Sequence, residues 1–275
     1  MAAERPLLFD FRTARAARAR AGRIGGERFL DQAALDGLTD RLAAVTRRFQ
    51  RGLWIGETLP RTIMPFAEHW RVADFDAKEI LDVGESSFDL AISLYSLQAI
   101  NDLPGALIQL RRALKPDGLF LAALFGGATL SELREIFAVA ESEILGGVSP
   151  RVAPLAGVRD LGALLQRAGF ALPVADVERL RIRYSDFTNL VRDLRAHGLS
   201  NALAARSRRA VNRRTLQAVI SHYVTKHSEG GKLNATFETL YLTGWSPHES
   251  QQQPLKPGSA KSRLSDVLGT VERKL

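Results

Sequence analysis

Seven consecutive apolar residues at 119–125 constrain the fold of this chain more than any other segment. A strand that is apolar on both faces is typical of a parallel sheet covered by helices on both sides. A second apolar run occupies 88–94, and between the two runs leucines recur at helical spacing over 103–114. A Lys-Pro-Asp-Gly sequence at 115–118 should end that helix and turn the chain. The order predicts a strand–helix–strand unit with a right-handed crossover.

Apolar runs and helical periodicity alternate along most of the chain. Further helices are predicted at 28–50, 59–69, 129–145, 161–169, 187–197 and 207–227, and further strands at 53–55, 72–74, 180–184 and 236–243. Thr129 and Glu132 have the spacing of a capping box at the start of the 129–145 helix. We therefore predict an α/β protein with a Rossmann-like doubly wound sheet and, late in the chain, an antiparallel strand pair.

The 275 residues are predicted to form three parts: a basic helical arm at 1–51, an α/β domain at 52–245 and a polar tail at 246–275. The stretch at 13–23 is rich in Ala and Arg, like an organellar transit peptide, but we interpret it as a structural arm because acidic and apolar residues flank it. No run of eighteen apolar residues predicts a membrane-spanning helix.

The net charge of +8 is concentrated in two segments. Residues 1–51 hold eleven Arg against six Asp or Glu, and residues 192–214 hold seven Arg against one Asp. Such segments suit an acidic partner, which leaves open a nucleic acid, an acidic carrier protein, a respiratory subunit or a membrane surface, or they are simply solvated helix faces. No aromatic residues interleave with the arginines, which argues against single-strand nucleic-acid binding.

The absence of cysteine excludes disulfides, thiolate metal sites and cysteine nucleophiles. The five histidines form no pair at metal-ligand spacing along a helix, so a local metal site is not expected. The sequence also contains neither a serine nucleophile elbow nor a phosphate-binding loop.

Residues 87–93, 101–107 and 112–120 resemble class I S-adenosylmethionine-dependent methyltransferases. A longer series, which ends in Gly244-Trp245 and His248-Glu249-Ser250-Gln251, is similar to a subfamily within them. That subfamily contains the mitochondrial complex I assembly factors of methyltransferase fold, with their bacterial relatives, and the malonyl-carrier-protein methyltransferases of biotin synthesis. The resemblance covers most of residues 7–260, and its C-terminal part is the more specific.

The resemblance implies a cofactor site for S-adenosylmethionine at the ends of the strands. Its residues would be Gly56, Glu57, Asp74, Ser93, Leu94, Ser96 and Gln98, with Asp74 on the ribose hydroxyls. Where the family has an acidic residue and then Gly-x-Gly-x-Gly, this chain has Trp54-Ile55-Gly56-Glu57-Thr58-Leu59-Pro60. Gly56 and Phe88 are only 32 positions apart, whereas the family usually has a helix, a strand, a helix and a strand there in roughly twice that length, and one βαβ unit alone needs ~30 residues. The resemblance therefore implies a sheet with a shortened N-terminal cofactor half.

For the chemistry, His248 is the candidate general base, and Glu249 is the candidate that orients it. The alternative is structural: Trp245 closes the core and His248 binds a backbone carbonyl. No metal is expected.

Two functions remain open. One is an S-adenosylmethionine-dependent methyltransferase that acts on an acceptor borne by a macromolecule. The other is a cofactor-deficient assembly or binding factor of the same fold, similar to the complex I factors that are associated with arginine hydroxylation. The expected location is the cytoplasm in a bacterium or the matrix side of a mitochondrion in a eukaryote.

Overall fold

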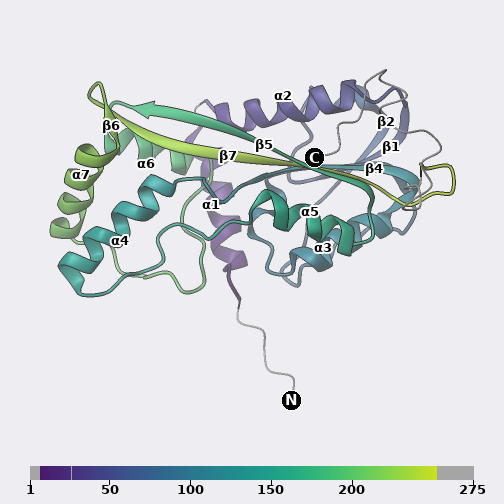
Figure 1. Ribbon diagram of the computed structural model, residues 1–275. Helices are drawn as coiled ribbons and strands as arrows, with labels where there is room; N and C mark the ends of the chain where they lie inside the picture. Colours follow the sequence, from purple (N-terminus) through teal and green to yellow (C-terminus); the bar gives the residue numbers. More distant parts are fainter. Residues whose placement is uncertain (1–6, 26, 253–275) are drawn as a thin grey trace, which may run out of the picture.

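The computed structural model describes residues 7–25 and 27–252 (Figure 1). Its helices are α1 (Phe11–Ile24), α2 (Phe29–Ala43), α3 (Leu103–Ala113), α4 (Ser131–Leu145), α5 (Val158–Arg167), α6 (Phe187–Ala196) and α7 (Arg213–His227). Its strands are β1 (Phe49–Ile55), β2 (Ala67–Ala73), β3 (Phe88–Leu94), β4 (Leu114–Phe125), β5 (Ala171–Tyr184), β6 (Ser228–Glu229) and β7 (Lys232–Trp245). Within this part of the chain, no helix has the length and apolar character needed to cross a bilayer.

The strands form one sheet in the order β2-β1-β3-β4-β7-β5, with the short β6 paired to β7. The first four strands of this order are parallel, whereas β7 runs antiparallel to both β4 and β5. The predicted α/β class, with its late antiparallel pair, is therefore confirmed. The strand predicted at 180–184 belongs to β5, which is the last strand of the sheet.

Helices cover both faces of the sheet (Figure 1). In β4, Phe120 and Leu124 pack into a core with α3 and α5, while Leu119 and Leu121 pack into another core with α2. Both faces of β4 are thus removed from water, which is the physical reason that the chain needs an unbroken apolar run there.

The long strands β5 and β7 extend to a separate group of helices at one end of the molecule (Figure 1). There α4, α6 and α7 enclose a third core that includes Leu133, Tyr223 and Phe237. The hydroxyl of Tyr223 donates to the carbonyl of Asn234 at 2.8 Å and ties α7 to β7.

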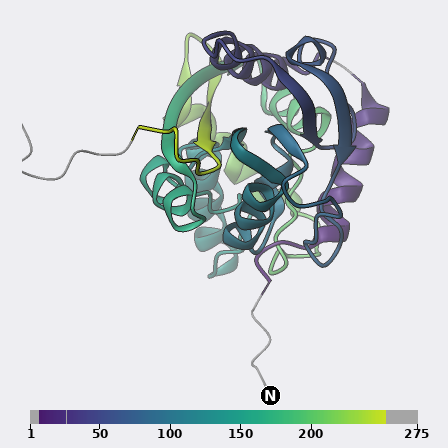
Figure 2. The same ribbon diagram turned by 90° about the vertical axis from the view of Figure 1, so that its right-hand side faces the viewer.

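The N-terminal segment is docked against the chain after α6. Phe9 forms a β-bridge with Leu203, and the side-chain oxygen of Asn101 accepts the backbone N–H groups of Leu8 and Phe9, each at 2.8 Å. Helix α1 consequently packs against α6 and runs along the side of the molecule (Figure 2).

Two helix predictions in the first third of the chain are wrong in extent or kind. The helix expected at 28–50 ends at Ala43, and residues 49–50 begin β1. Gly52 lies inside β1, where a methyl group would meet the ring of Trp70 at 2.5 Å. The helix expected at 59–69 is absent: a single 3-10 turn, Met64–Phe66, leads into β2, which pairs along β1 and so satisfies this segment's backbone groups.

The expected capping box is also wrong. Helix α4 begins at Ser131, and Leu130 is its N-cap. The Thr129 hydroxyl instead donates to the carbonyl of Glu238 and accepts its N–H, while Glu132 accepts the N–H of Thr236 at 3.2 Å. A tertiary contact with β7 has replaced the local cap.

The later predictions hold with shifted boundaries. The helix expected at 207–227 begins only at Arg213, while β5 and β7 extend beyond their predicted limits. The polar tail beyond residue 252 lies outside the described residues.

Candidate functional site

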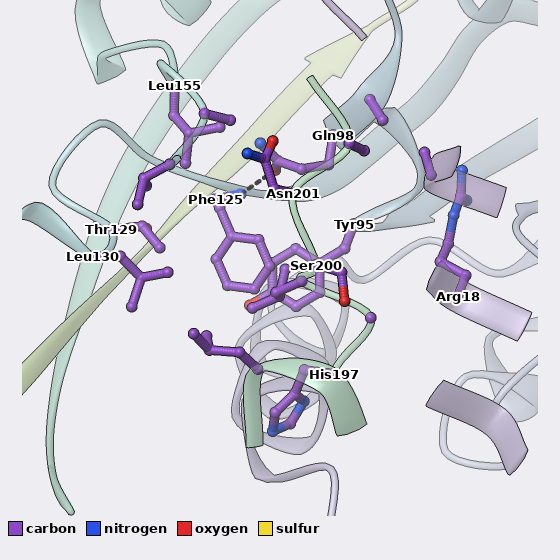
Figure 3. Close-up of a pocket in the computed structure, with 18 of the residues that line it drawn as sticks. Arg18, Tyr95, Gln98, Phe125, Thr129, Leu130, Leu155, His197, Ser200 and Asn201 are labelled. Carbon is purple, nitrogen blue, oxygen red and sulfur yellow. Dashed lines mark hydrogen bonds between the residues drawn. The ribbon is translucent and has the colours of Figure 1, made fainter. Parts of the chain in front are cut away.

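A cavity of about 440 Å³ lies beyond the carboxyl ends of β3 and β4 (Figure 3). Its walls come from the turn after β3, the end of β4, the N-terminal segment with α1, and α6 with residues 197–202 that follow it. The carboxyl ends of parallel strands are where open α/β sheets usually bind ligands. This volume lies within the range of small-molecule pockets, ~300–1,000 Å³.

Two stacked aromatic rings form part of the cavity wall (Figure 3). The centroids of Tyr95 and Phe125 are 4.0 Å apart, and the rings are nearly parallel, with an interplanar angle of 3°. Tyr95 has a φ of 53°, an unusual value for a residue with a side chain. Its hydroxyl bonds the hydroxyl of Thr239 at 2.9 Å, and burial raises the pKa of Tyr95 above its ordinary value. Strain of this kind often accompanies a functional site.

Gln98 holds the turn after β3 against β4. Its side-chain oxygen accepts the N–H of Phe125 at 2.6 Å (Figure 3). The amide nitrogen of Gln98 remains available as a donor at the cavity wall. Ser96, also in the wall, donates a long hydrogen bond of 3.4 Å to the carbonyl of Leu94.

The charged residues of the lining are mostly basic. They are Arg18, Arg28, Arg151 and Arg195, against the single carboxylate of Asp31. Three of the arginines pair with carboxylates: Arg28 with Asp31 at 2.8 Å, Arg151 with Glu141 at 2.6 Å and Arg18 with Asp74 at 3.6 Å. Arg195 has no carboxylate partner among residues 7–25 and 27–252. The cavity therefore favours a ligand that carries negative charge.

His197 is a buried titratable residue in the same lining. Its side chain is only 2% exposed, and neither ring nitrogen has a hydrogen-bond partner in the described part of the chain. Asp31 lies 3.7 Å from Nδ1, and the edge of the imidazole meets the ring of Phe29. A buried donor without a partner costs free energy, and a ligand in the cavity can supply that partner.

The structure brings only part of the predicted cofactor set to this cavity. Leu94, Ser96 and Gln98 line it. Ser93 is fully buried in β3, and its hydroxyl has no partner among the described residues. The other three predicted residues, Gly56, Glu57 and Asp74, follow β1 and β2 and are absent from the lining.

The turn at Gly56 shows whether S-adenosylmethionine fits as the resemblance implies. Gly56 has a φ of 148°, which favours glycine. A methyl group there would lie 3.1 Å from the Ser96 hydroxyl and 3.1 Å from Nε1 of Trp54. Protein atoms thus stand close against this side of the Gly56 backbone. Trp54 itself is buried in the core beneath α2.

The connection from β1 to β2 provides no helix that could bind the cofactor through its N-terminus. It contains the Met64–Phe66 turn but no α-helix, so this connection supplies no helix N-terminus at the end of β1. Thr58 is exposed there, and Pro60 has no N–H to donate.

Asp74 is placed directly after β2, as predicted, but its carboxylate is already engaged. It accepts the N–H of Phe75 at 2.9 Å and lies 3.6 Å from a guanidinium nitrogen of Arg18. Partial burial raises the pKa of Asp74, although Arg18 favours its charged form. These residues do not fit S-adenosylmethionine in the manner that the resemblance implies.

His248 and Glu249 lie at the other end of the strands. They follow β7, whose last residue, Trp245, pairs with Leu119 near the start of β4. The imidazole of His248 is exposed and bonds the hydroxyl of Ser250 at 2.7 Å. The structure does not bring this pair to the cavity.

Sequence reasoning missed the residues that close the cavity: Arg18, Tyr95, Phe125, Arg151 and His197. The only available signal was the basic character of the segments 1–51 and 192–214, which contribute α1 and α6 to the walls. No local spacing could indicate that segments so far apart in the sequence meet over the end of β3. Among the described residues, no group of three or more His, Asp or Glu is arranged to hold a metal.

Comparisons with known proteins agree with this architecture. Residues 60–122 match the methyltransferase domain family. The chain is 43% identical over 196 residues to "Arginine-hydroxylase NDUFAF5, mitochondrial" of Dictyostelium discoideum, which takes in 70% of this chain and 44% of that protein. It is 43% identical over 192 residues to the human protein of that name, with 69% and 55% covered.

A second group of relatives is named for methyl transfer. The chain is 38% identical over 169 residues to the malonyl-(acyl-carrier protein) O-methyltransferase of Nitrosospira multiformis, with 62% of this chain and 53% of that protein covered. The chain thus spans about half the length of each of these relatives.

The solved structures show the fold. The YcgJ protein of Bacillus subtilis superposes with a TM-score of 0.50 at 14% identity and covers 77% of this chain and 98% of its own. A Bacillus halodurans protein assigned to the methyltransferases gives the same TM-score at 12% identity, with the same coverage.

Proposed function

Because this chain is a methyltransferase-fold protein related both to NDUFAF5 arginine hydroxylases and to malonyl-(acyl-carrier protein) O-methyltransferases, we propose that it is a binding factor of the assembly type. In this proposal it receives a group borne by an acidic protein in the cavity between α1 and α6. The location suggested for such a factor is the bacterial cytoplasm or the mitochondrial matrix.

One observation carries the proposal: Ser96 and Trp54 stand close against Gly56, each with an atom 3.1 Å from where a Cβ would lie. Removing protein atoms from that space would require a change in the buried packing around Trp54, and well-packed interiors resist such changes. The fold can persist without the chemistry of its family, because function belongs to sites and not to folds.

Methyl transfer is the competing proposal. The match to the methyltransferase domain family and the presence of Leu94, Ser96 and Gln98 in the cavity wall support it. In that case S-adenosylmethionine would have to bind on the β3 side of the sheet edge, away from Gly56.

Titration with S-adenosylmethionine separates the two proposals. We expect no saturable heat in calorimetry and no rise in melting temperature at millimolar ligand. A true ligand at one hundred times its Kd would add ~2.7 kcal/mol of stability, which is easily detected. The variant Thr58→Gly/Pro60→Gly, which restores glycines to the turn, should also fail to bind because Ser96 and Trp54 remain in place. Saturable binding to the unaltered chain would overturn our proposal in favour of methyl transfer.

The partner is proposed from the charge around the cavity. Helices α1 and α6 pack together, and the ion pair between Asp10 and Arg206 joins their segments at 3.2 Å. The two basic segments, separate in the sequence, therefore meet beside the cavity mouth. An acidic protein surface complements such a face, and long-range attraction would speed its encounter.

Charge reversal on α1 tests this docking face. Arg20→Glu/Arg23→Glu changes exposed residues only, and we expect about tenfold weaker binding to the partner, with a smaller salt dependence. The matched control is Arg181→Glu/Arg183→Glu on the exposed edge strand β5. This variant changes the net charge by the same amount at positions outside the cavity lining. Purified acyl carrier protein and a purified complex I subunit serve as parallel probes in pull-down and calorimetry. Equal losses in the two variants, or binding to neither probe, would contradict the proposed face.

A further inference from the structure

A second cavity, of about 530 Å³, lies between the end of α4 and the start of α7. Its polar lining includes Ser149, Arg151, Ser207, Arg209, Asn212 and Thr215. Arg151 lines both cavities, so its guanidinium forms part of the partition between them. Nothing in the proposed function uses this second space.

The first turn of α7 borders the cavity. Asn212 is the N-cap, and its side-chain oxygen accepts the N–H of Thr215 at 2.7 Å. Among the helix residues of this turn, Thr215 reaches the cavity lining, whereas Arg213 and Arg214 do not. The fifteen-residue helix also presents the positive end of its dipole here.

Thr215 provides independent evidence of a missing ligand. The residue is 1% exposed and lines the cavity, yet its hydroxyl oxygen has no hydrogen-bond partner in the described part of the chain. Buried hydroxyls are nearly always hydrogen-bonded, and an orphan in the wall of a cavity is explained when a ligand supplies its partner. The hydroxyl can rotate to donate a hydrogen bond.

The charges around this space are strongly unbalanced. Arg208, Arg209, Arg213 and Arg214 are all exposed, and none of them pairs with a carboxylate among residues 7–25 and 27–252. The carboxylate in the lining is Glu141, and both of its oxygens are already taken, one by the guanidinium of Arg151 and the other by the N–H of Ser149 at 2.7 Å. The Ser207 hydroxyl accepts the N–H of Arg209 at 3.2 Å and keeps its own proton to donate.

We propose that this cavity is a binding site for a phosphate group, held by the Thr215 and Ser207 hydroxyls and the Arg209 guanidinium beside the N-terminal end of α7. A phosphate is a tetrahedral anion with several oxygens that accept hydrogen bonds. It therefore complements a site that offers hydroxyl donors, a guanidinium and the positive end of a helix. The exposed arginines at 208, 209, 213 and 214, which pair with no carboxylate in the described part of the chain, then acquire a role. The site is independent of whether S-adenosylmethionine binds.

Inorganic phosphate is the first probe. Its binding is measured by calorimetry and by the line width of its phosphorus resonance. We expect saturable binding to the full chain, and about tenfold weaker binding in Arg209→Gln, the loss typical of one charge-assisted hydrogen bond. Thr215→Val keeps the side-chain shape and removes the orphan hydroxyl, so it should weaken phosphate binding without lowering the melting temperature. Glycerol 3-phosphate forms the second arm: tighter binding than that of inorganic phosphate assigns the site to a phosphate ester, and weaker binding assigns it to the free ion.

The control is Arg183→Gln on β5, which removes the same charge at an exposed position outside the cavity. It should leave phosphate affinity unchanged. A linear, non-saturating response, or equal weakening in Arg183→Gln and Arg209→Gln, would reduce the interaction to general charge attraction and overturn the site. Because Arg209 is exposed, its variant tests binding without endangering the fold.

Discussion

The Arg151→Met variant should lose about 3–5 kcal/mol of unfolding free energy, because it leaves a buried carboxylate without its counter-charge. The partner, Glu141, is 0% exposed, and Arg151 reaches one of its oxygens from two nitrogens, at 2.6 and 2.7 Å. Once the guanidinium is gone, only the N–H of Ser149 remains to stabilise that charge. Urea denaturation at neutral pH, followed by circular dichroism, measures the loss.

Two further variants separate this mechanism from a general effect of losing an arginine. Arg47 pairs with Asp117 where both side chains are over a third exposed, so Arg47→Met should cost under ~1 kcal/mol. The double variant Glu141→Leu/Arg151→Met removes both charges and should recover most of the stability. If Arg151→Met is no more destabilising than Arg47→Met, Glu141 is not the buried charge that the structure describes.

This ion pair also connects stability with the two cavities. Arg151 and Glu141 fix residues 149–151, and this short stretch forms part of the wall of both spaces. A ligand in either cavity therefore contacts a segment whose position depends on one buried interaction. Binding and stability should respond together when that interaction is weakened.

The sequence predicted the centre of the fold well because the physical demand there is simple. Residues 119–125 are apolar throughout since α2 covers one face of β4 and α3 and α5 cover the other. Asp102, a residue type that favours helix caps, accepts the N–H of Gly105 at the start of α3. Both features depend on local pattern and on burial, which a single sequence records.

The failures lie where tertiary contacts overrode local pattern. Residues 59–69 have helical spacing, yet pairing with β1 draws the last three residues of this segment, 67–69, into β2. Thr129 has a strong capping signature, but the backbone of Glu238 in β7 offers its hydroxyl a partner on each side. The prediction of the site was incomplete for the same reason. His197 and Arg18 reach the cavity because α1 and α6 pack together, and no local spacing in the sequence encodes that contact.

Glycine-to-alanine changes in two helices should have opposite effects on stability. Alanine normally stabilises a helix interior, and Gly22 in α1 has nothing within 4 Å of an added methyl group. Gly22→Ala should therefore gain about 0.4–1 kcal/mol. At Gly37 in α2 the added methyl would lie 2.3 Å from the hydroxyl oxygen of Tyr241 and 2.5 Å from the ring carbon that bears it. Gly37→Ala should cost about 1–3 kcal/mol, the usual penalty of overpacking.

The cost at Gly37 depends on whether Tyr241 can move, and its surroundings hold it in place. The ring is 1% exposed, and the guanidinium of Arg41 stacks on it at 3.8 Å while also donating to the carbonyl of Gly37. A double-mutant cycle isolates the contact: Gly37→Ala should lose its penalty when Tyr241→Leu has already removed the ring. Thermal and urea unfolding of the four proteins give the coupling energy. If Gly37→Ala is stabilising in the original background, as Gly22→Ala should be, then α2 does not lie as close to β7 as the structure places it.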